Sequence, residues 1–88
     1  MSATPENWQS LPKSTKDLER ARESMIEEFQ AINWYQQRID ATDDPELRRI
    51  LEHNRDEEKE HAALLFEYIK ARDPEQARAL EESDLAEG

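Results

Sequence analysis

Two stripes of residues, each with alternating three- and four-residue spacing, constrain how this chain can fold. The first stripe is Leu18, Ala21, Met25, Glu28, Ile32, Tyr35 and Ile39, and the second is Leu47, Leu51, Asn54, Glu58, His61, Leu65 and Tyr68. This spacing places each stripe on one face of an α-helix. A carboxylate on such a face is costly to bury unless it is paired, protonated or bound to a metal. Glu28, Glu58 and His61 therefore predict a metal site inside a helical bundle.

Helix-start and helix-stop residues predict an all-α chain in three parts. Ser14 or Thr15 can cap a first helix, and Asp44 can cap a second one that begins at Pro45. The connection is short, so the two helices form an antiparallel hairpin. The predicted parts are a flexible N-terminal segment at residues 1–13, a helical hairpin at 14–72, and a short helix with an acidic tail at 73–88.

The size and composition of the chain predict self-association. The chain has 88 residues, of which only 35% are hydrophobic, and it lacks cysteine. A single hairpin has no enclosed centre, and oligomerisation is the remaining way for a short chain without disulfides to bury enough apolar surface. Further apolar residues beside the two stripes indicate more than one subunit contact; they are Ile26, Phe29, Ile50, Leu64 and Ile69.

The charge of the chain excludes some classes of partner. The formal net charge is −10. Nucleic acid and anionic membranes are unexpected partners, because both need a basic footprint. The first residues lack the apolar core of a secretory signal, and no stretch has the length of apolar residues that a membrane span requires. A cytosolic location is therefore expected.

The spacing of the three candidate ligands predicts where they meet. Glu58 and His61 lie three residues apart, on one face of the second helix. Glu28 lies 15 residues before Asp43 and Glu58 lies 15 residues after it, so the two face each other in an antiparallel hairpin. Two hairpins related by a two-fold axis would form a four-helix bundle with Glu from two helices and Glu-x-x-His from the other two, a di-metal carboxylate set. Oxygen and imidazole ligands suit iron or manganese, and also zinc or cobalt.

Two further polar residues of the stripes, Tyr35 and Asn54, have two interpretations each, and His53 beside the second stripe has one. Tyr35 can hydrogen-bond a ligand or a metal-bound oxygen, or it can be an aromatic packing residue. Asn54 can orient a ligand or fix the register of pairing. His53 is expected on the surface, paired with Glu57 one turn later.

Residues 25–72 resemble the encapsulated ferritins, two-helix ferritin-like proteins held inside encapsulin shells. The similar stretches include Trp34-Tyr35 and the run from His53 to His61, His-Asn-Arg-Asp-Glu-Glu-Lys-Glu-His. The resemblance implies a ferroxidase that oxidises Fe(II) to Fe(III) with dioxygen. Two iron ions per subunit pair would be held by Glu28, Glu58 and His61 of each chain, with Tyr35 close by. The ferric product would be stored as mineral inside the shell.

The resemblance also implies an assembly and a route for iron. The family forms decameric rings of five dimers, with the site at one of two kinds of interface, inside a cytoplasmic encapsulin nanocompartment. A metal entry site is implied at Glu27, Gln30 and Trp34, although Gln30 stands where an acid is usual. The sequence up to Gly88 contains no segment like the family's C-terminal shell-targeting peptide, so a longer chain, a fusion or another route to the shell is expected.

Two other functions fit the same residues. A helical adaptor could use its polar stripe residues only to specify register and partner. A metal buffer could bind iron or zinc at the same ligands without oxidising it. A measurement of catalytic turnover separates a buffer from a ferroxidase. Glu28→Ala should abolish the metal site of a ferroxidase or a buffer, and it should hardly affect an adaptor.

Overall fold

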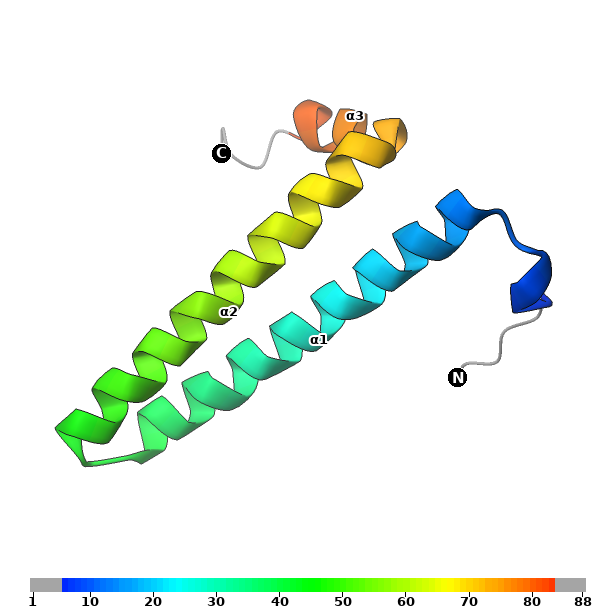
Figure 1. Ribbon diagram of the computed structural model, residues 1–88. Helices are drawn as coiled ribbons and strands as arrows, with labels where there is room; N and C mark the ends of the chain where they lie inside the picture. Colours follow the sequence, from blue (N-terminus) through cyan, green and yellow to red (C-terminus); the bar gives the residue numbers. More distant parts are fainter. Residues whose placement is uncertain (1–5, 84–88) are drawn as a thin grey trace.

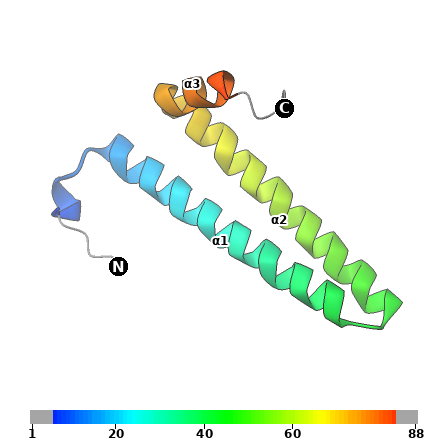
Figure 2. The same cartoon turned by 180° about the vertical axis from the view of Figure 1, so that it is seen from behind.

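The computed structural model describes residues 6–83, which form an antiparallel helical hairpin with a short third helix. Helix α1 (Lys13–Ala41) and helix α2 (Pro45–Arg72) lie side by side, joined by a short turn (Figure 1). Helix α3 (Pro74–Glu82) turns away from the far end of α2, as both views show (Figures 1 and 2). A single 3-10 turn, η1 (Trp8–Ser10), precedes α1. The described part of the chain contains no strand, and none of its helices could cross a membrane.

The start of α2 follows the predicted capping pattern. The Asp44 carboxylate accepts hydrogen bonds from the amides of Glu46 and Leu47 at 3.0 and 3.4 Å, and Pro45 occupies the first helical position. These bonds satisfy amides that have no partner within the helix. Arg48 then secures the turn, because its guanidinium donates to the carbonyl oxygens of Ile39 and Thr42. The short connection thus brings the end of α1 against the start of α2.

The start of α1 differs from the sequence prediction. The prediction that Ser14 or Thr15 caps this helix is wrong, because α1 begins at Lys13 and no side chain caps it. Pro12 is the flanking residue, and its carbonyl already accepts from the amide of Lys16 at 3.1 Å. The fixed φ of proline favours helix initiation, so the helix begins two residues before the first position that a Ser14 cap would allow.

Part of the predicted flexible N-terminal segment packs against α1. The Trp8 ring lies 5.9 Å from the Lys16 ammonium and 5.5 Å from the Arg20 guanidinium carbon. Cations over an indole face are attracted by the ring quadrupole. These contacts hold η1 beside the first turns of α1. The outer parts of the two predicted terminal segments, residues 1–5 and 84–88, lie outside the residues that the structure describes.

The hairpin has a thin core, as a lone pair of helices must. Within residues 6–83 the buried apolar side chains are Ala21, Ile39, Ala62 and Ile69. Several large apolar side chains remain exposed, among them Ile26, Phe29, Trp34, Leu47, Ile50, Leu64 and Leu80. Apolar surface of this kind marks contact sites in soluble proteins. The exposed residues are consistent with the predicted self-association, which stays a prediction.

Candidate metal centre

The first stripe lies at the contact between α1 and α2, as predicted. The second stripe is rotated about the axis of α2, so that neighbouring residues take its place at the contact. Every member of the first stripe is buried or half-buried. On α2 the buried positions are Ala62 and Ile69, one residue beyond the predicted His61 and Tyr68. Within one hairpin the His61 side chain is 54% exposed at the edge of the contact, and its predicted place inside a bundle of two hairpins stays a prediction. Small and aliphatic side chains occupy the buried positions of the contact, whereas the imidazole of His61 remains accessible to water.

Three predicted ligands nevertheless meet at this edge. Glu28 comes from α1, and Glu58 and His61 come from consecutive turns of α2. The His61 Nδ1 atom lies 2.9 Å from Glu58 Oε1 and 3.6 Å from Glu28 Oε1. One ligand atom from each residue lies within 4.8 Å of the others, and no other group of three such side chains occurs in residues 6–83. The hairpin thus joins an i, i+3 pair to a carboxylate 30 residues earlier in the chain.

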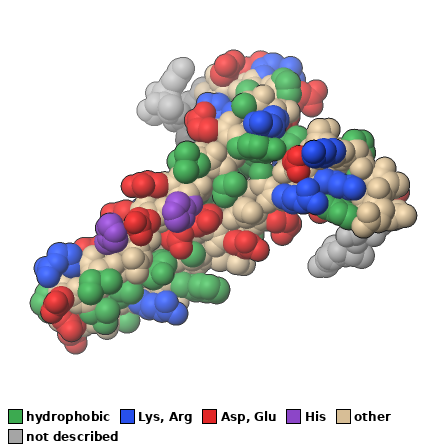
Figure 3. Space-filling view, viewed as in Figure 1, with side chains coloured by type: hydrophobic (Ala, Val, Ile, Leu, Met, Phe, Trp, Pro, Cys, Tyr) green, Lys and Arg blue, Asp and Glu red, His purple; other side chains and the backbone are tan. Residues whose placement is uncertain are grey.

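The cluster opens to one face of the hairpin. The side chains of Glu28 and Glu58 are 25% and 23% exposed, so both are largely withdrawn from water, whereas His61 forms the open rim. Both histidines are visible on the same face of the molecule, among acidic side chains (Figure 3). One hairpin therefore supplies one side of a site and leaves the other side available to a further group.

The protonation of the cluster reflects its crowded carboxylates. Hydrogen bonding with Glu58, then burial, raises the pKa of Glu28 above its ordinary value. The same hydrogen bond lowers the pKa of Glu58, so Glu58 ionises first and Glu28 keeps the proton longer. Hydrogen bonding to Glu58 also raises the pKa of His61. Glu28 and His61 thus release their protons at higher pH than usual, whereas Glu58 ionises at lower pH, as expected when two carboxylates share a site with an imidazole.

The donor set fits a divalent transition metal. Ligand atoms about 2.0–2.2 Å from an ion lie at most about 4 Å apart, so the 4.8 Å cluster needs only small side-chain rotations to close around one. Carboxylate oxygen and imidazole nitrogen suit iron, manganese, cobalt and zinc. Three ligands from one chain leave coordination positions open, which a catalytic site requires.

The remaining predicted site residues lie outside the cluster. Tyr35 is half-buried on α1, two turns beyond Glu28, and its hydroxyl makes no hydrogen bond within residues 6–83. Glu27, Gln30 and Trp34 are exposed on α1. Their roles in metal entry stay predictions.

Two polar neighbours of α2 can be placed directly. His53 pairs with Glu57 at 3.3 Å on the surface, which confirms the predicted pair. Asn54 is half-buried. Sequence reasoning missed Arg55, which lies at the helix contact. The sequence does contain one indication of this position, because Arg55 lies seven residues before the buried Ala62 and therefore on the same face of α2.

Comparison with known proteins identifies relatives over nearly the whole chain. The EncFtn-like family model matches residues 3–86. An encapsulated ferritin-like protein of Rhodospirillum rubrum is 45% identical over 99% of this chain, and the chain spans 62% of that protein. A ferritin-like protein of Thermotoga maritima is 49% identical over 73% of the chain, which spans 56% of that protein.

Two further similarities extend the comparison. An encapsulin nanocompartment cargo protein, EncC of Myxococcus xanthus, is 45% identical over 83% of this chain, which spans 58% of that relative. The matched stretches thus span less than two thirds of the length of each of these three curated relatives. A crystal structure of a protein from Nitrosomonas europaea superposes with a TM-score of 0.85 at 44% identity, covering 96% of this chain and 92% of that one. The predicted resemblance to encapsulated ferritins is confirmed, and the chain belongs to the EncFtn-like family.

Proposed function

We propose that this protein is a ferroxidase that oxidises Fe(II) to Fe(III) with dioxygen at a di-iron centre formed between two subunits. The observation that carries the proposal is the convergence of Glu28 from α1 with Glu58 and His61 from α2 on an open face. A second hairpin placed there about a two-fold axis supplies the same three ligands, giving four carboxylates and two imidazoles for two iron ions. This is the ligand set of ferritin-like di-metal bundles.

The charges of the residues favour two divalent ions at this interface. Four carboxylates carry −4 when ionised, which two Fe(II) ions balance. The raised pKa of Glu28 reflects the cost of leaving the carboxylates uncompensated in one hairpin. Iron would compete with protons at Glu28 and His61 and would join the two subunits. The two substrate ions would then lose one electron each to dioxygen, which takes up two protons and leaves as hydrogen peroxide. The carboxylates would hold the more highly charged product ions until they leave.

The assembly proposed around this centre follows from relatives. The Rhodospirillum rubrum and Myxococcus xanthus relatives are named as an encapsulated ferritin-like protein and an encapsulin cargo protein. These names support a place inside an encapsulin shell. We propose that this chain forms a ring of five dimers inside such a shell in the cytoplasm, which would receive the ferric mineral. Glu27, Gln30 and Trp34 form the proposed entry path for iron, and Tyr35 the proposed neighbour of the ions.

The alternatives are separated by different observations. The adaptor accounts for polar residues at a helix contact, but it gives no reason for three metal ligands from separate helices to converge. The metal buffer shares every ligand with the ferroxidase, and only turnover distinguishes the two.

Ferrous-iron oxidation in air tests the proposal. The wild type should exceed the buffer blank, and Glu28→Ala and the double variant Glu58→Ala, His61→Ala should not. The matched control is Glu57→Ala, His53→Ala, which removes the surface Glu-His pair on the same helix. Wild-type oxidation no faster than the blank overturns the ferroxidase, and metal binding that persists in that case identifies a buffer.

A further inference from the structure

An arginine lies at the contact between the two long helices. Arg55 precedes the buried Ala62 by seven residues, which places both on the same face of α2. Only 20% of the Arg55 side chain is exposed. A guanidinium withdrawn from water to this extent must be hydrogen-bonded, because an unpaired buried charge is costly. The partners of Arg55 therefore determine how the two helices meet at this point.

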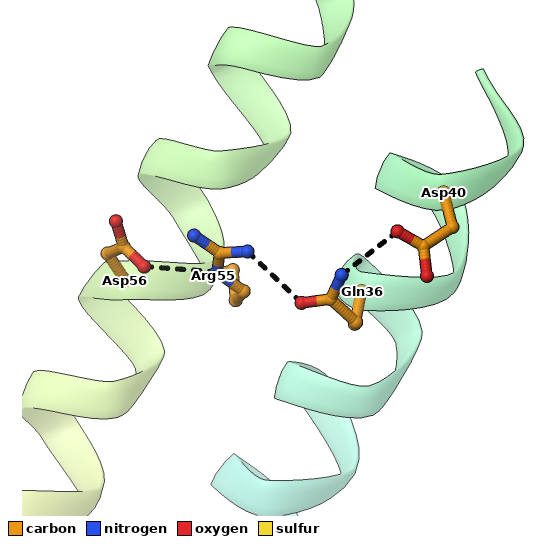
Figure 4. Close-up of polar contacts among 4 residues, drawn as sticks. All are labelled: Gln36, Asp40, Arg55 and Asp56. Carbon is orange, nitrogen blue, oxygen red and sulfur yellow. Dashed lines mark hydrogen bonds and ion pairs between the residues drawn. The ribbon is translucent and has the colours of Figure 1, made fainter.

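Arg55 belongs to a chain of hydrogen bonds that crosses the hairpin (Figure 4). Its Nη1 donates to Gln36 Oε1 at 3.1 Å, and its Nε donates to Asp56 Oδ1 at 3.0 Å. Gln36 Nε2 in turn donates to Asp40 Oδ1 at 3.1 Å. The bond to Asp40 turns the Gln36 amide so that its oxygen accepts from Arg55. Carboxylates thus orient the donor on α2 and the acceptor on α1.

This network lies on the flank of the helix contact opposite the metal centre. Gln36 lies eight residues after Glu28, two turns and about 80° around α1. Gln36 shares its side of α1 with Phe29, seven residues earlier, and Phe29 lines a groove on that flank with Met25, Lys59, Ala62, Ala63 and Phe66. The metal ligands are absent from this groove. The Arg55–Gln36 network and the metal centre therefore lie on opposite sides of the contact between α1 and α2.

Near Glu58, apolar packing alone does little to fix the rotation of α2 about its own axis. Ala62 is the buried apolar side chain of α2 nearest to Glu58, and alanine offers little shape to interlock. A roll of α2 by about 20° would move atoms at its side-chain radius of about 5 Å by about 2 Å. Metal ligands tolerate deviations of only about 0.2 Å. Such a roll would carry Glu58 and His61 out of reach of an ion bound at Glu28.

We propose that Arg55, acting through Gln36, is a positioning residue that sets the rotation and height of α2 so that Glu58 and His61 face Glu28. The inference rests on the proposed function, because it takes these three residues as metal ligands. Arg55 itself touches neither the ions nor dioxygen. Its guanidinium supplies a directional link that the small contact residues lack.

Cobalt binding to the full chain tests this role, with a matched arginine as the control. Arg22 also crosses the hairpin, pairing with Asp73 at 3.0 Å near the open end. Arg55→Met should lower Co(II) affinity by about tenfold or more and change the visible absorption of bound Co(II), an effect comparable to loss of a ligand-orienting residue. Arg22→Met should stay within about threefold of wild type, because exposed ion pairs contribute little.

Gln36, the hydrogen-bond partner of Arg55, provides a second test in case Arg55→Met folds poorly. Gln36→Leu should weaken Co(II) binding in the same direction, and the double variant should be no worse than Arg55→Met alone, since one contact is lost in both. The proposal is overturned if Gln36→Leu unfolds at the wild-type temperature and binds Co(II) like wild type. It is also overturned if Arg55→Met and Arg22→Met weaken binding equally.

A structural readout separates this inference from the proposed function. Wild type that takes up no Co(II) contradicts the metal centre. In that case crystal structures of metal-free wild type and Arg55→Met decide the positioning role. The variant should show α2 rotated and its Glu58 and His61 atoms separated from Glu28 by more than the 4.8 Å of the described cluster. An undisturbed cluster in the variant overturns the inference.

Discussion

The Nδ1 atom of His61 lies 2.9 Å from the Oε1 atom of Glu58, one helical turn earlier on α2. This contact engages one of the two ring nitrogens that could ligate an ion and favours the protonated ring. It raises the pKa of His61 above its ordinary value, and the nearby Glu28 carboxylate acts in the same direction. The protonated form of His61 is therefore favoured between the two carboxylates, and protons and metal would compete for the same position.

Metal binding should strengthen as pH rises through the raised pKa of His61. Below that pKa the ring is protonated and a metal must displace the proton; above it the nitrogen is free. Co(II) titrations between about pH 6 and pH 8 should show affinity rising with pH in the wild type. His61→Ala should bind weakly with a flatter pH profile, and an equally steep profile in that variant would contradict this competition.

The stability of the metal-free protein should have the opposite dependence on pH near neutrality. A raised pKa means that the folded state binds the His61 proton more tightly than the unfolded state. The stabilisation is fully present below the ordinary pKa of histidine and is lost as pH rises through the higher folded value. Urea unfolding should show this loss in wild type, and His53→Ala should retain it.

Glu28→Gln should stabilise the metal-free protein and abolish its response to metal. The raised pKa of Glu28 shows that its ionised form is disfavoured beside Glu58, so a neutral amide relieves repulsion at neutral pH. Thermal unfolding with a chelator should give a higher midpoint than wild type, while added Co(II) should give no further rise. Glu27→Gln, at an exposed neighbouring position, is the control. A lower chelated midpoint for Glu28→Gln would contradict the repulsion.

Metal should drive association of the subunits. If one hairpin supplies half of the ligands, ions at the interface bind only the associated state and stabilise it by mass action. Sizing chromatography should show larger species with Fe(II) or Co(II) and smaller ones with a chelator. Glu58→Ala, His61→Ala should lose this difference. Identical elution with and without metal in the wild type would argue against an interfacial centre.

Phe29→Glu should reduce the size of the assembly while leaving the metal ligands intact. Phe29 is 51% exposed and lines the apolar groove on the flank away from the centre. A charge there opposes burial of the groove against another subunit. Sizing chromatography should show a smaller species that still binds Co(II). Loss of Co(II) binding together with assembly would show that the two flanks are not independent.

Asp44→Ala should destabilise the hairpin by about 1 kcal/mol, because the two capping bonds at the start of α2 disappear. For a chain of this size the unfolding midpoint should fall by about 4–8 °C. Asp43→Ala, which removes a neighbouring acid with no capping bond, should change the midpoint far less. Equal shifts for both variants would show that the cap is not the cause.

Local rules in the sequence determined most of the helix boundaries and the identity of the candidate ligands. Asp44 and Pro45 specify where α2 begins, and the heptad spacing of the first stripe selects the face of α1 that meets α2. The equal distances of Glu28 and Glu58 from the turn place them at one height, since a short connection leaves little freedom in register. These features depend on neighbours in the chain, so they can be read before any fold is known.

Only the tertiary structure decided how α2 is rotated. Adjacent helical positions lie about 100° apart, and the second stripe could face α1 through His61 or through Ala62. Ala62 takes the contact because it allows close approach, which leaves His61 on the open rim. The Arg55–Gln36 bridge likewise joins residues 19 positions apart and exists only once the helices pair. Such choices follow from packing between distant segments, which the pattern within one helix does not encode.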